Sequence, residues 1–119
     1  MDNLTGVWKL VKTRVVDRDG NEQPSPLGPE PMGIIMFDAD RIMVVVCDGR
    51  KTIPSDAQRA FVSYAGTYQF DGREIVTRVH GASSPEGFAD QVREIRFEGS
   101  NRYVASPSPG YELTWERVS

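Results

Sequence analysis

Apolar and polar residues alternate with a period of two along most of this chain, and this pattern constrains the fold more than any other feature of the sequence. It is clear at Gly6–Val16, Phe61–Phe70 and Glu74–Ala82. Successive side chains of a β-strand point to opposite faces of a sheet, so this period indicates strands that bury one face. No long segment places apolar residues at helical spacing, and the sequence predicts an all-β protein.

Short turns rich in Gly, Asp, Ser and Asn separate the expected strands. In addition to the three segments above, strands are expected at residues 32–37, 42–47, 89–99, 101–107 and 110–118. The short connections favour pairing of sequence neighbours, so we predict an eight-stranded, antiparallel, up-and-down barrel. Closure removes free sheet edges, and eight strands enclose a space for about one small ligand.

Two positions interrupt this pattern. Gly66 lies inside an expected strand, where a glycine typically marks a bulge or a bend. The segment 51–60 does not alternate, and Pro54, with the Ser-Asp that follows it, predicts one or two helical turns over residues 55–60. This short helix is expected either to lie across the open end of the barrel as a lid or to be an ordinary surface crossover.

Composition and charge narrow the class of protein. A chain of 119 residues is the size of one domain, so residues 1–119 are expected to form a single unit. The net charge of -3, with both signs interspersed, argues against nucleic acid as a partner, and no apolar run is long enough to cross a membrane. The first residues lack the layout of a signal peptide, so a cytoplasmic location is expected, with a homodimer as the default oligomer.

Metal and cofactor sites are not expected. The chain has one cysteine, Cys47, and one histidine, His80, which lie on different expected strands. Because there is no CxxC pair and no His-x-His pair, the sequence predicts neither an internal disulfide nor a metal ligand set. It contains no phosphate-binding loop and no nucleophile elbow.

Alternation also predicts which polar side chains face the interior. Charged residues occupy one face of the segment 89–97 and should meet water, so Gln91 and Arg93 are expected to face inward. An arginine on an apolar face needs a partner, because burying an uncompensated charge is costly. Arg93 would bind a carboxylate or other oxyanion through its planar guanidinium, or it would pair with an internal acidic residue or a backbone carbonyl for structure alone.

Three further side chains are candidates for the same region. Tyr64 and Tyr68 share the aromatic face of their strand, which is expected to face inward. The next strand allows two registers, one that leaves His80 on the surface and one that turns it inward. We predict that His80 alone, near the end of the strand, turns inward and joins Tyr64, Gln91 and Arg93 in one polar patch, with Arg78 near the rim. There His80 or Tyr64 would be the proton donor or acceptor.

The first strand contains Gly6-Val7-Trp8, a Gly-x-Trp sequence. Five segments, spread in order over the whole chain, have a comparable resemblance: Leu4–Val11, Ser25–Phe37, Tyr64–Tyr68, Val92–Phe97 and Leu113–Val118. Together they resemble the lipocalin-like domain family of bacteria and fungi, which has a calycin-type β-barrel. The turn Asp38–Arg41 departs from that family, which usually has a glycine there, and its type is left open.

The resemblance implies a structural role for Trp8. In lipocalin and calycin barrels the tryptophan of Gly-x-Trp plugs the closed end, and a basic residue of the last strand packs over its indole. Arg117 is the matching residue of this chain. A guanidinium over an indole face contributes about 0.5–2 kcal/mol. Most members of the family have no assigned activity, so the resemblance supports the fold more than the function.

Three functions are compatible with these observations. The first is binding of a small amphipathic or hydrophobic molecule that carries a carboxylate or other oxyanion, between walls that include Met36 and Val44. The second is a cofactor-independent isomerase or cyclase acting on a small hydrophobic substrate in the same cavity, with His80 or Tyr64 as acid or base and Arg93 as oxyanion stabiliser. The third is a barrel filled by its own methionine and phenylalanine side chains, with a structural or interaction role.

Overall fold

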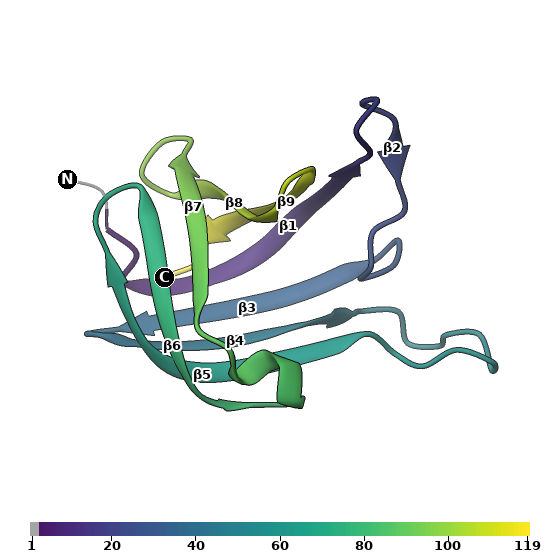
Figure 1. Cartoon of the computed structure of the whole chain (residues 1–119), viewed down its shortest axis with the longest axis horizontal. Coiled ribbons are helices and arrows are strands. Elements are labelled where there is room, and N and C mark those ends of the chain that lie inside the picture. Colours follow the sequence, from purple (N-terminus) through teal and green to yellow (C-terminus); the bar gives the residue numbers. More distant parts are fainter. Residues whose placement is uncertain (1–2) are drawn as a thin grey trace.

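The chain folds into a closed antiparallel β-barrel, which the computed structural model describes for residues 3–119 (Figure 1). The strands are β1 (Gly6–Val16), β2 (Glu22–Gln23), β3 (Pro31–Asp38), β4 (Arg41–Asp48), β5 (Phe61–Phe70), β6 (Glu74–Ala82), β7 (Gln91–Phe97), β8 (Arg102–Ser108) and β9 (Tyr111–Arg117). Their order in the sheet is β2-β1-β3-β4-β5-β6-β7-β8-β9, and β1 also pairs with β9. The predicted up-and-down barrel is confirmed, with the two-residue β2 as an addition at the end of β1.

The interior of the barrel is built by strict alternation. In β3, Gly33, Ile35 and Phe37 are buried while the residues between them are exposed. In β4, Ile42 and Val44 point inward in the same way. These strands therefore each contribute one apolar face to a common core, as the period of the sequence predicts.

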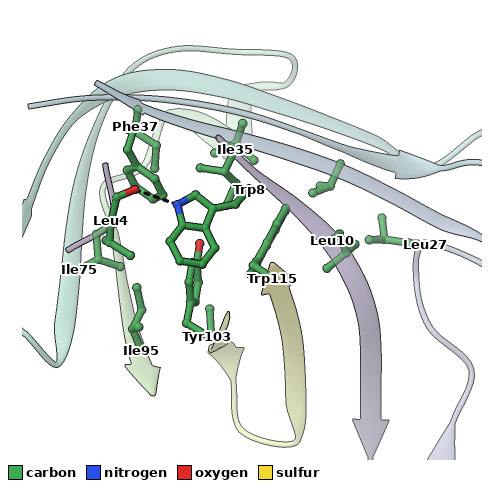
Figure 2. Close-up of a cluster of buried hydrophobic side chains, with 14 residues drawn as sticks. Leu4, Trp8, Leu10, Leu27, Ile35, Phe37, Ile75, Ile95, Tyr103 and Trp115 are labelled. Atoms are coloured by element: carbon green, nitrogen blue, oxygen red, sulfur yellow. Dashed lines mark hydrogen bonds between the residues drawn. The ribbon is translucent and has the colours of Figure 1, made fainter. Parts of the chain in front are cut away.

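Trp8 closes one end of the barrel (Figure 2). Its side chain is fully buried, its Nε1 donates to the carbonyl of Leu4 over 2.8 Å, and Tyr103 packs edge-on with ring centroids 4.7 Å apart. The guanidinium carbon of Arg117 lies 4.3 Å from the Trp8 ring centroid, so the expected contact between these two residues is present. Arg117 also donates to the backbone carbonyls of Asn3, Thr5 and Ser100.

The glycine of the Gly-x-Trp sequence, Gly6, lies directly beside Ser119, which leaves no room for a side chain at this position. Gly6 has a φ of 127°, a region that side chains disfavour, and a Cβ there would collide with the carbonyl oxygen of Ser119. The amide of Val7 donates to that same carbonyl over 2.9 Å. The last residue of the chain therefore packs against the residues that lead into Trp8.

A bulge between β5 and β6 sets the orientation of His80. Gly66 pairs with Val79 and Ala65 pairs with Gly81, so His80 is the extra residue and has no direct partner. The bulge predicted at Gly66 is confirmed, and a Cβ on Gly66 would collide with the Arg78 carbonyl.

The prediction that His80 faces inward is wrong, because β6 adopts the other register. Ile75 and Thr77 are buried, and His80 is exposed. The inward position of Thr77 lies opposite Gln91 of β7, where two polar side chains are neighbours. Both faces of β6 carry apolar residues, so alternation could not distinguish the two registers.

The helix predicted for residues 55–60 is not formed. A single turn occurs there, in which the amide of Ala57 donates to the carbonyl of Pro54 over 3.1 Å. Six residues cannot repay the cost of helix nucleation without an apolar face to bury. Within residues 3–119 the helical element is the 3-10 turn η1 (Pro85–Phe88), and no helix in that range is long and apolar enough to cross a membrane.

The bulge generates the first prediction. We expect Gly66→Ala to lower the free energy of unfolding by about 2–3 kcal/mol, because the added Cβ must displace the backbone of Arg78. Gly81→Ala is the matched control, since it lies in the same bulge and a Cβ there has open space. It should change stability by less than about 0.5 kcal/mol. Urea denaturation measures both, and equal losses would show that the close approach at Gly66 does not constrain the bulge.

Candidate functional site

The barrel encloses a cavity of about 330 Å³ between its closed end and its mouth. Every strand from β3 to β9 contributes to its wall. The apolar lining residues are Ile35, Phe37, Ile42, Val44, Val46, Ala60, Val62, Ile75, Ile95, Ala105, Leu113 and Trp115. Val44 is among them, as the sequence predicts. The hypothesis of a barrel filled by its own side chains is wrong for this interior.

The cavity exists because three methionines point away from it. Met32, Met36 and Met43 are 40%, 48% and 59% exposed on the outer surface. The prediction that Met36 lines the cavity is therefore wrong. Its neighbours Ile35 and Phe37 take the inward positions of β3, and Met36 alternates with them.

A polar patch lies on one side of the otherwise apolar wall. Its members are Tyr64 on β5, Thr77 on β6, and Gln91 and Arg93 on β7, and all four line the cavity. Thr77 is the direct partner of Gln91, and Arg93 lies two residues further along the same face of β7. The sequence analysis predicted Tyr64, Gln91 and Arg93 together, whereas Thr77 was missed because the register of β6 was misassigned.

Arg93 is the cation of this patch, and it has no acidic partner among the described residues. Its one hydrogen bond there is from Nη1 to the carbonyl of Val92, over 3.2 Å. The ion pairs that the structure shows within residues 3–119 do not include it. The alternative in which Arg93 pairs with an internal carboxylate is therefore not realised, whereas the hydrogen bond to a backbone carbonyl, the other structural alternative, is present. That bond does not neutralise the charge of the guanidinium.

Gln91 presents a second unsatisfied group. Its Oε1 is buried and accepts no hydrogen bond within the described part of the chain. A buried acceptor without a donor costs about 1–3 kcal/mol, so native structures usually provide a partner. This oxygen is a position where a water molecule or the donor group of a ligand would be held.

Tyr64 supplies a neutral hydroxyl beside these two groups. Burial raises the pKa of its phenol above the ordinary value of 10.0, while the Arg93 charge and the Gln91 side chain act in the opposite direction. The phenol therefore keeps its proton at neutral pH. Tyr68 also faces inward, but it packs edge-on against Phe37 with ring centroids 4.9 Å apart and does not line the cavity.

Among the residues that the structure describes, the lining holds neither a histidine nor a carboxylate. Its ionisable side chains are Arg93 and the three tyrosines Tyr64, Tyr103 and Tyr111, and burial raises the pKa of each tyrosine. His80 lies outside the lining. The cavity can therefore hold an anion and donate hydrogen bonds to it, but it offers no proton acceptor of ordinary basicity.

Leu27 covers the mouth of the cavity. It belongs to the loop between β2 and β3, it is 5% exposed, and it lines the cavity together with Pro26. Its amide donates to Ser25 Oγ over 3.1 Å. Figure 2 shows Leu27 and Leu4 on opposite sides of the aromatic cluster. The predicted lid, residues 51–60, contributes only Ala60 to the lining, so this part of the prediction is wrong.

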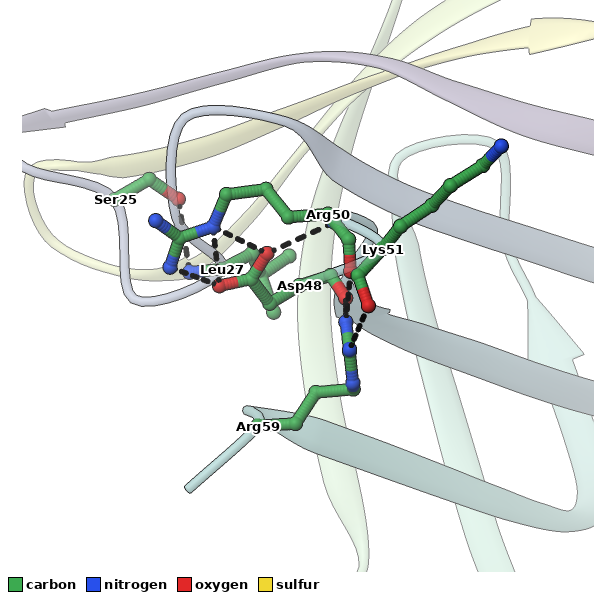
Figure 3. Close-up of polar contacts among 6 residues, drawn as sticks. All are labelled: Ser25, Leu27, Asp48, Arg50, Lys51 and Arg59. Carbon is green, nitrogen blue, oxygen red and sulfur yellow. Dashed lines mark hydrogen bonds and ion pairs between the residues drawn. The ribbon is translucent and has the colours of Figure 1, made fainter. Parts of the chain in front are cut away.

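An ion pair between Asp48 and Arg50 stabilises the loops at the mouth of the cavity (Figure 3). Asp48, 5% exposed at the end of β4, accepts from Arg50 Nε over 3.0 Å and from Arg50 Nη2 over 2.6 Å. Arg59 donates to the carbonyls of Asp48 and Lys51 over 2.7 and 3.2 Å. A Cβ on Gly28 would lie 2.6 Å from Asp48 Oδ2, so the loop that carries Leu27 also packs on this carboxylate.

Sequence reasoning missed Asp48 and Leu27 as elements of the site. The signal for Asp48 was its place at the inward position that ends an apolar strand, two residues before an arginine. The signal for Leu27 was a single large apolar residue in a loop otherwise rich in proline, glycine and polar residues. Arg50, two residues after Asp48, forms an ion pair with that carboxylate, whereas Arg93 has no acidic partner among the described residues.

No metal centre is indicated in the part of the chain that the structure describes. No group of three or more His, Cys, Asp or Glu side chains comes together within it. Cys47 is a buried free thiol.

Comparison with known proteins identifies the type of domain. A family model described as a lipocalin-like domain matches residues 5–118, which is nearly the whole chain. Comparisons with curated proteins and with solved structures found no match.

The ion pair at the mouth generates a prediction on pH. The hydrogen bonds from Arg50 hold the pKa of the Asp48 carboxyl below its ordinary value of 3.8. Its contribution to stability is therefore present above that value and is lost as the pH falls through the lower pKa of the folded protein. We expect Asp48→Asn to lower the urea midpoint at pH 7 and to differ less from the wild type at pH 2.5.

The control for this experiment is Asp56→Asn, at an exposed position of the adjoining loop. It should leave the midpoint unchanged at both pH values. If the midpoint of Asp48→Asn were lowered equally at pH 7 and pH 2.5, the ion pair would not be the source of the stabilisation.

Proposed function

The chain belongs to the lipocalin-like domain family, and on this basis we propose that its barrel binds one small amphipathic molecule that carries a carboxylate or other oxyanion. The apolar part of the ligand fills the cavity, and the oxyanion pairs with Arg93. One observation carries the proposal: a cation lines an otherwise apolar cavity and has no acidic partner among residues 3–119.

The physical argument concerns the charge of Arg93. A guanidinium that is partly removed from water loses hydration, and an anion beside it restores the lost interaction. The planar guanidinium can form two parallel hydrogen bonds to a carboxylate, and such charge-assisted bonds are about twice as strong as neutral ones. The volume of about 330 Å³ lies at the lower end of the roughly 300–1,000 Å³ of small-molecule sites, which suits a short chain or a single ring.

The residues beside Arg93 narrow the class of ligand that we propose. Gln91 Oε1 needs a donor, and the Tyr64 hydroxyl can donate to an oxyanion. A molecule with a hydroxyl or N–H group next to its carboxylate satisfies all three residues at once. Hydroxy acids and N-substituted amino acids have this arrangement, so they should bind better than simple fatty acids of the same length.

Binding is favoured over catalysis by the position of His80. The isomerase or cyclase alternative used His80 or Tyr64 as acid or base, and His80 lies outside the cavity. Tyr64 has a raised pKa and remains protonated near neutral pH. It can orient a ligand or stabilise a negative charge, but it is a poor proton acceptor there.

The test compares octanoate with octan-1-ol, which share the chain length and differ in charge. We expect the wild type to bind octanoate about tenfold or more tightly than octan-1-ol in calorimetric titrations at low salt. Arg93→Gln should lose this preference because it removes the cation and keeps a polar, uncharged side chain. Arg96→Gln is the matched control, since Arg96 lies on the same strand with an exposed side chain, and it should bind like the wild type.

Either of two results would contradict the proposal. One is an affinity for octanoate that Arg93→Gln leaves unchanged. The other is the absence of binding of both probes at millimolar concentration in a protein whose circular dichroism shows a folded β-barrel. A further comparison, 2-hydroxyoctanoate against octanoate, addresses Gln91 alone, and Gln91→Leu should abolish any advantage of the hydroxy acid.

A further inference from the structure

The outer surface of β3, β4 and β5 carries a mostly apolar face, and we propose that it binds a second copy of this chain to make a two-fold symmetric dimer. This inference rests on the outside of the barrel and is independent of the ligand proposed above. It identifies the surface through which the chain would associate.

The strand register arranges this face in three rows. The first row runs Val7–Met36–Met43–Ala65, the second runs Ile34–Val45–Ser63 and is bordered on β1 by the exposed Lys9, and the third runs Met32–Cys47–Phe61, where Cys47 is buried. Neighbours within each row are direct partners on adjacent strands. We call these residues the apolar face. Met32, Ile34, Met36, Met43 and Phe61 are its most exposed members, between 37% and 59%.

The opposite side of the barrel shows what an ordinary solvated surface of this chain looks like. The outer positions of β7, β8, β9 and β1 carry alternating charges, which pair across strands. Arg96 contacts Glu112 over 3.8 Å, and Arg102 contacts Glu116 over 2.8 Å. The same alternation that places charges outside on these strands places only uncharged residues in the three rows on β3, β4 and β5, and Lys9 of β1 lies at the edge of the second row. This difference indicates that the apolar face is covered in the working protein.

The topology restricts how a partner can be added. The sheet is closed by the pairing of β1 with β9, so a partner strand cannot extend it along most of its length. Association must therefore occur face to face, with the sheets about 10 Å apart. A gently curved face of methionine and branched side chains can interdigitate in this way.

The charges at the border of the face favour a copy of this chain as the partner. The row next to Met36 and Met43 contains Asp38 and Arg41, which are direct partners and both exposed. A border that holds both signs is complementary to itself under two-fold rotation, because each acid can face the base of the other copy. Lys9, next to Ile34 on β1, is a further exposed base of this border, so an acidic partner protein would be repelled by Asp38 and a basic one by Arg41 and Lys9.

The exposed apolar side chains of this face lie together. Five of them are 37–59% exposed, and with the half-buried neighbours and the charged border they would form the apolar centre and the polar rim of a contact. A standard interface buries roughly 800 Å² per partner. Met43 is the most exposed of these residues and occupies the central strand of the face.

Sedimentation equilibrium tests the proposal. The wild type at about 50 μM is expected to have a mass of about 26.6 kDa, twice the 13.3 kDa of one chain. Met43→Glu should shift the protein to the monomer mass, because two carboxylates would be buried in the contact. Met36→Glu on the neighbouring strand should act in the same way. Both side chains are about half exposed in the single chain, so the substitutions should leave the circular dichroism unchanged.

The matched control is Val92→Glu, which places the same charge at a position 52% exposed on the opposite side of the barrel. It should remain a dimer. A wild type that is monomeric at 50 μM would overturn the proposal, and so would a dimer that tolerates Met43→Glu. A monomer that instead binds lipid vesicles or a different protein through this face would equally exclude the second copy as its partner.

Discussion

The double pairing of β1, with β3 on one side and β9 on the other, is the interaction on which the rest of this structure depends. β1 is 11 residues long, and a register shift between Leu10 and Lys12 lets it follow both neighbours. Trp8 lies at this seam, directly opposite Arg117 of β9 and Ile35 of β3. The indole thus joins the first, second and last long strands of the barrel, and its contact with Arg117 closes the bottom of the interior.

The cavity is a consequence of how the two ends are closed. At one end the large side chains of Trp8, Tyr103 and Trp115 pack against each other and fill the space. At the other end the Asp48–Arg50 ion pair holds the loops, and Leu27 with its neighbour Pro26 lies over the mouth. The wall of the cavity is formed by side chains of β3 to β9, while Met32, Met36 and Met43 are exposed on the outer surface. The space that remains is therefore apolar except where β5, β6 and β7 bring the polar patch together.

The sequence predicted the orientation of a strand where charges mark its outer face, and failed where such marks are missing. In β7 the charged residues occupy alternate positions, so Gln91 and Arg93 were placed correctly. In β3 the apolar run around Met36 has no polar residue to mark its outer face, and in β6 both faces carry apolar residues. Orientation there depends on pairing with distant strands, as the bulge at Gly66 shows for His80. The Asp48–Arg50 ion pair and the position of Leu27 depend on how the loops pack. Loop sequences have no periodic pattern from which that packing could be predicted.

The central claim is that the interior of the barrel, beside Arg93, receives the ligand. Adjacent residues of β3 allow a direct measurement, because Ile35 faces the cavity and Ile34 faces the outside. We would record intermolecular nuclear Overhauser effects between the methyl group of bound octanoate and the isoleucine methyl groups of the protein. The account predicts contacts to Ile35 and Ile95, together with a shift of the Arg93 Nε resonance. Contacts to Ile34 without contacts to Ile35 would place the ligand on the outer surface and contradict the account.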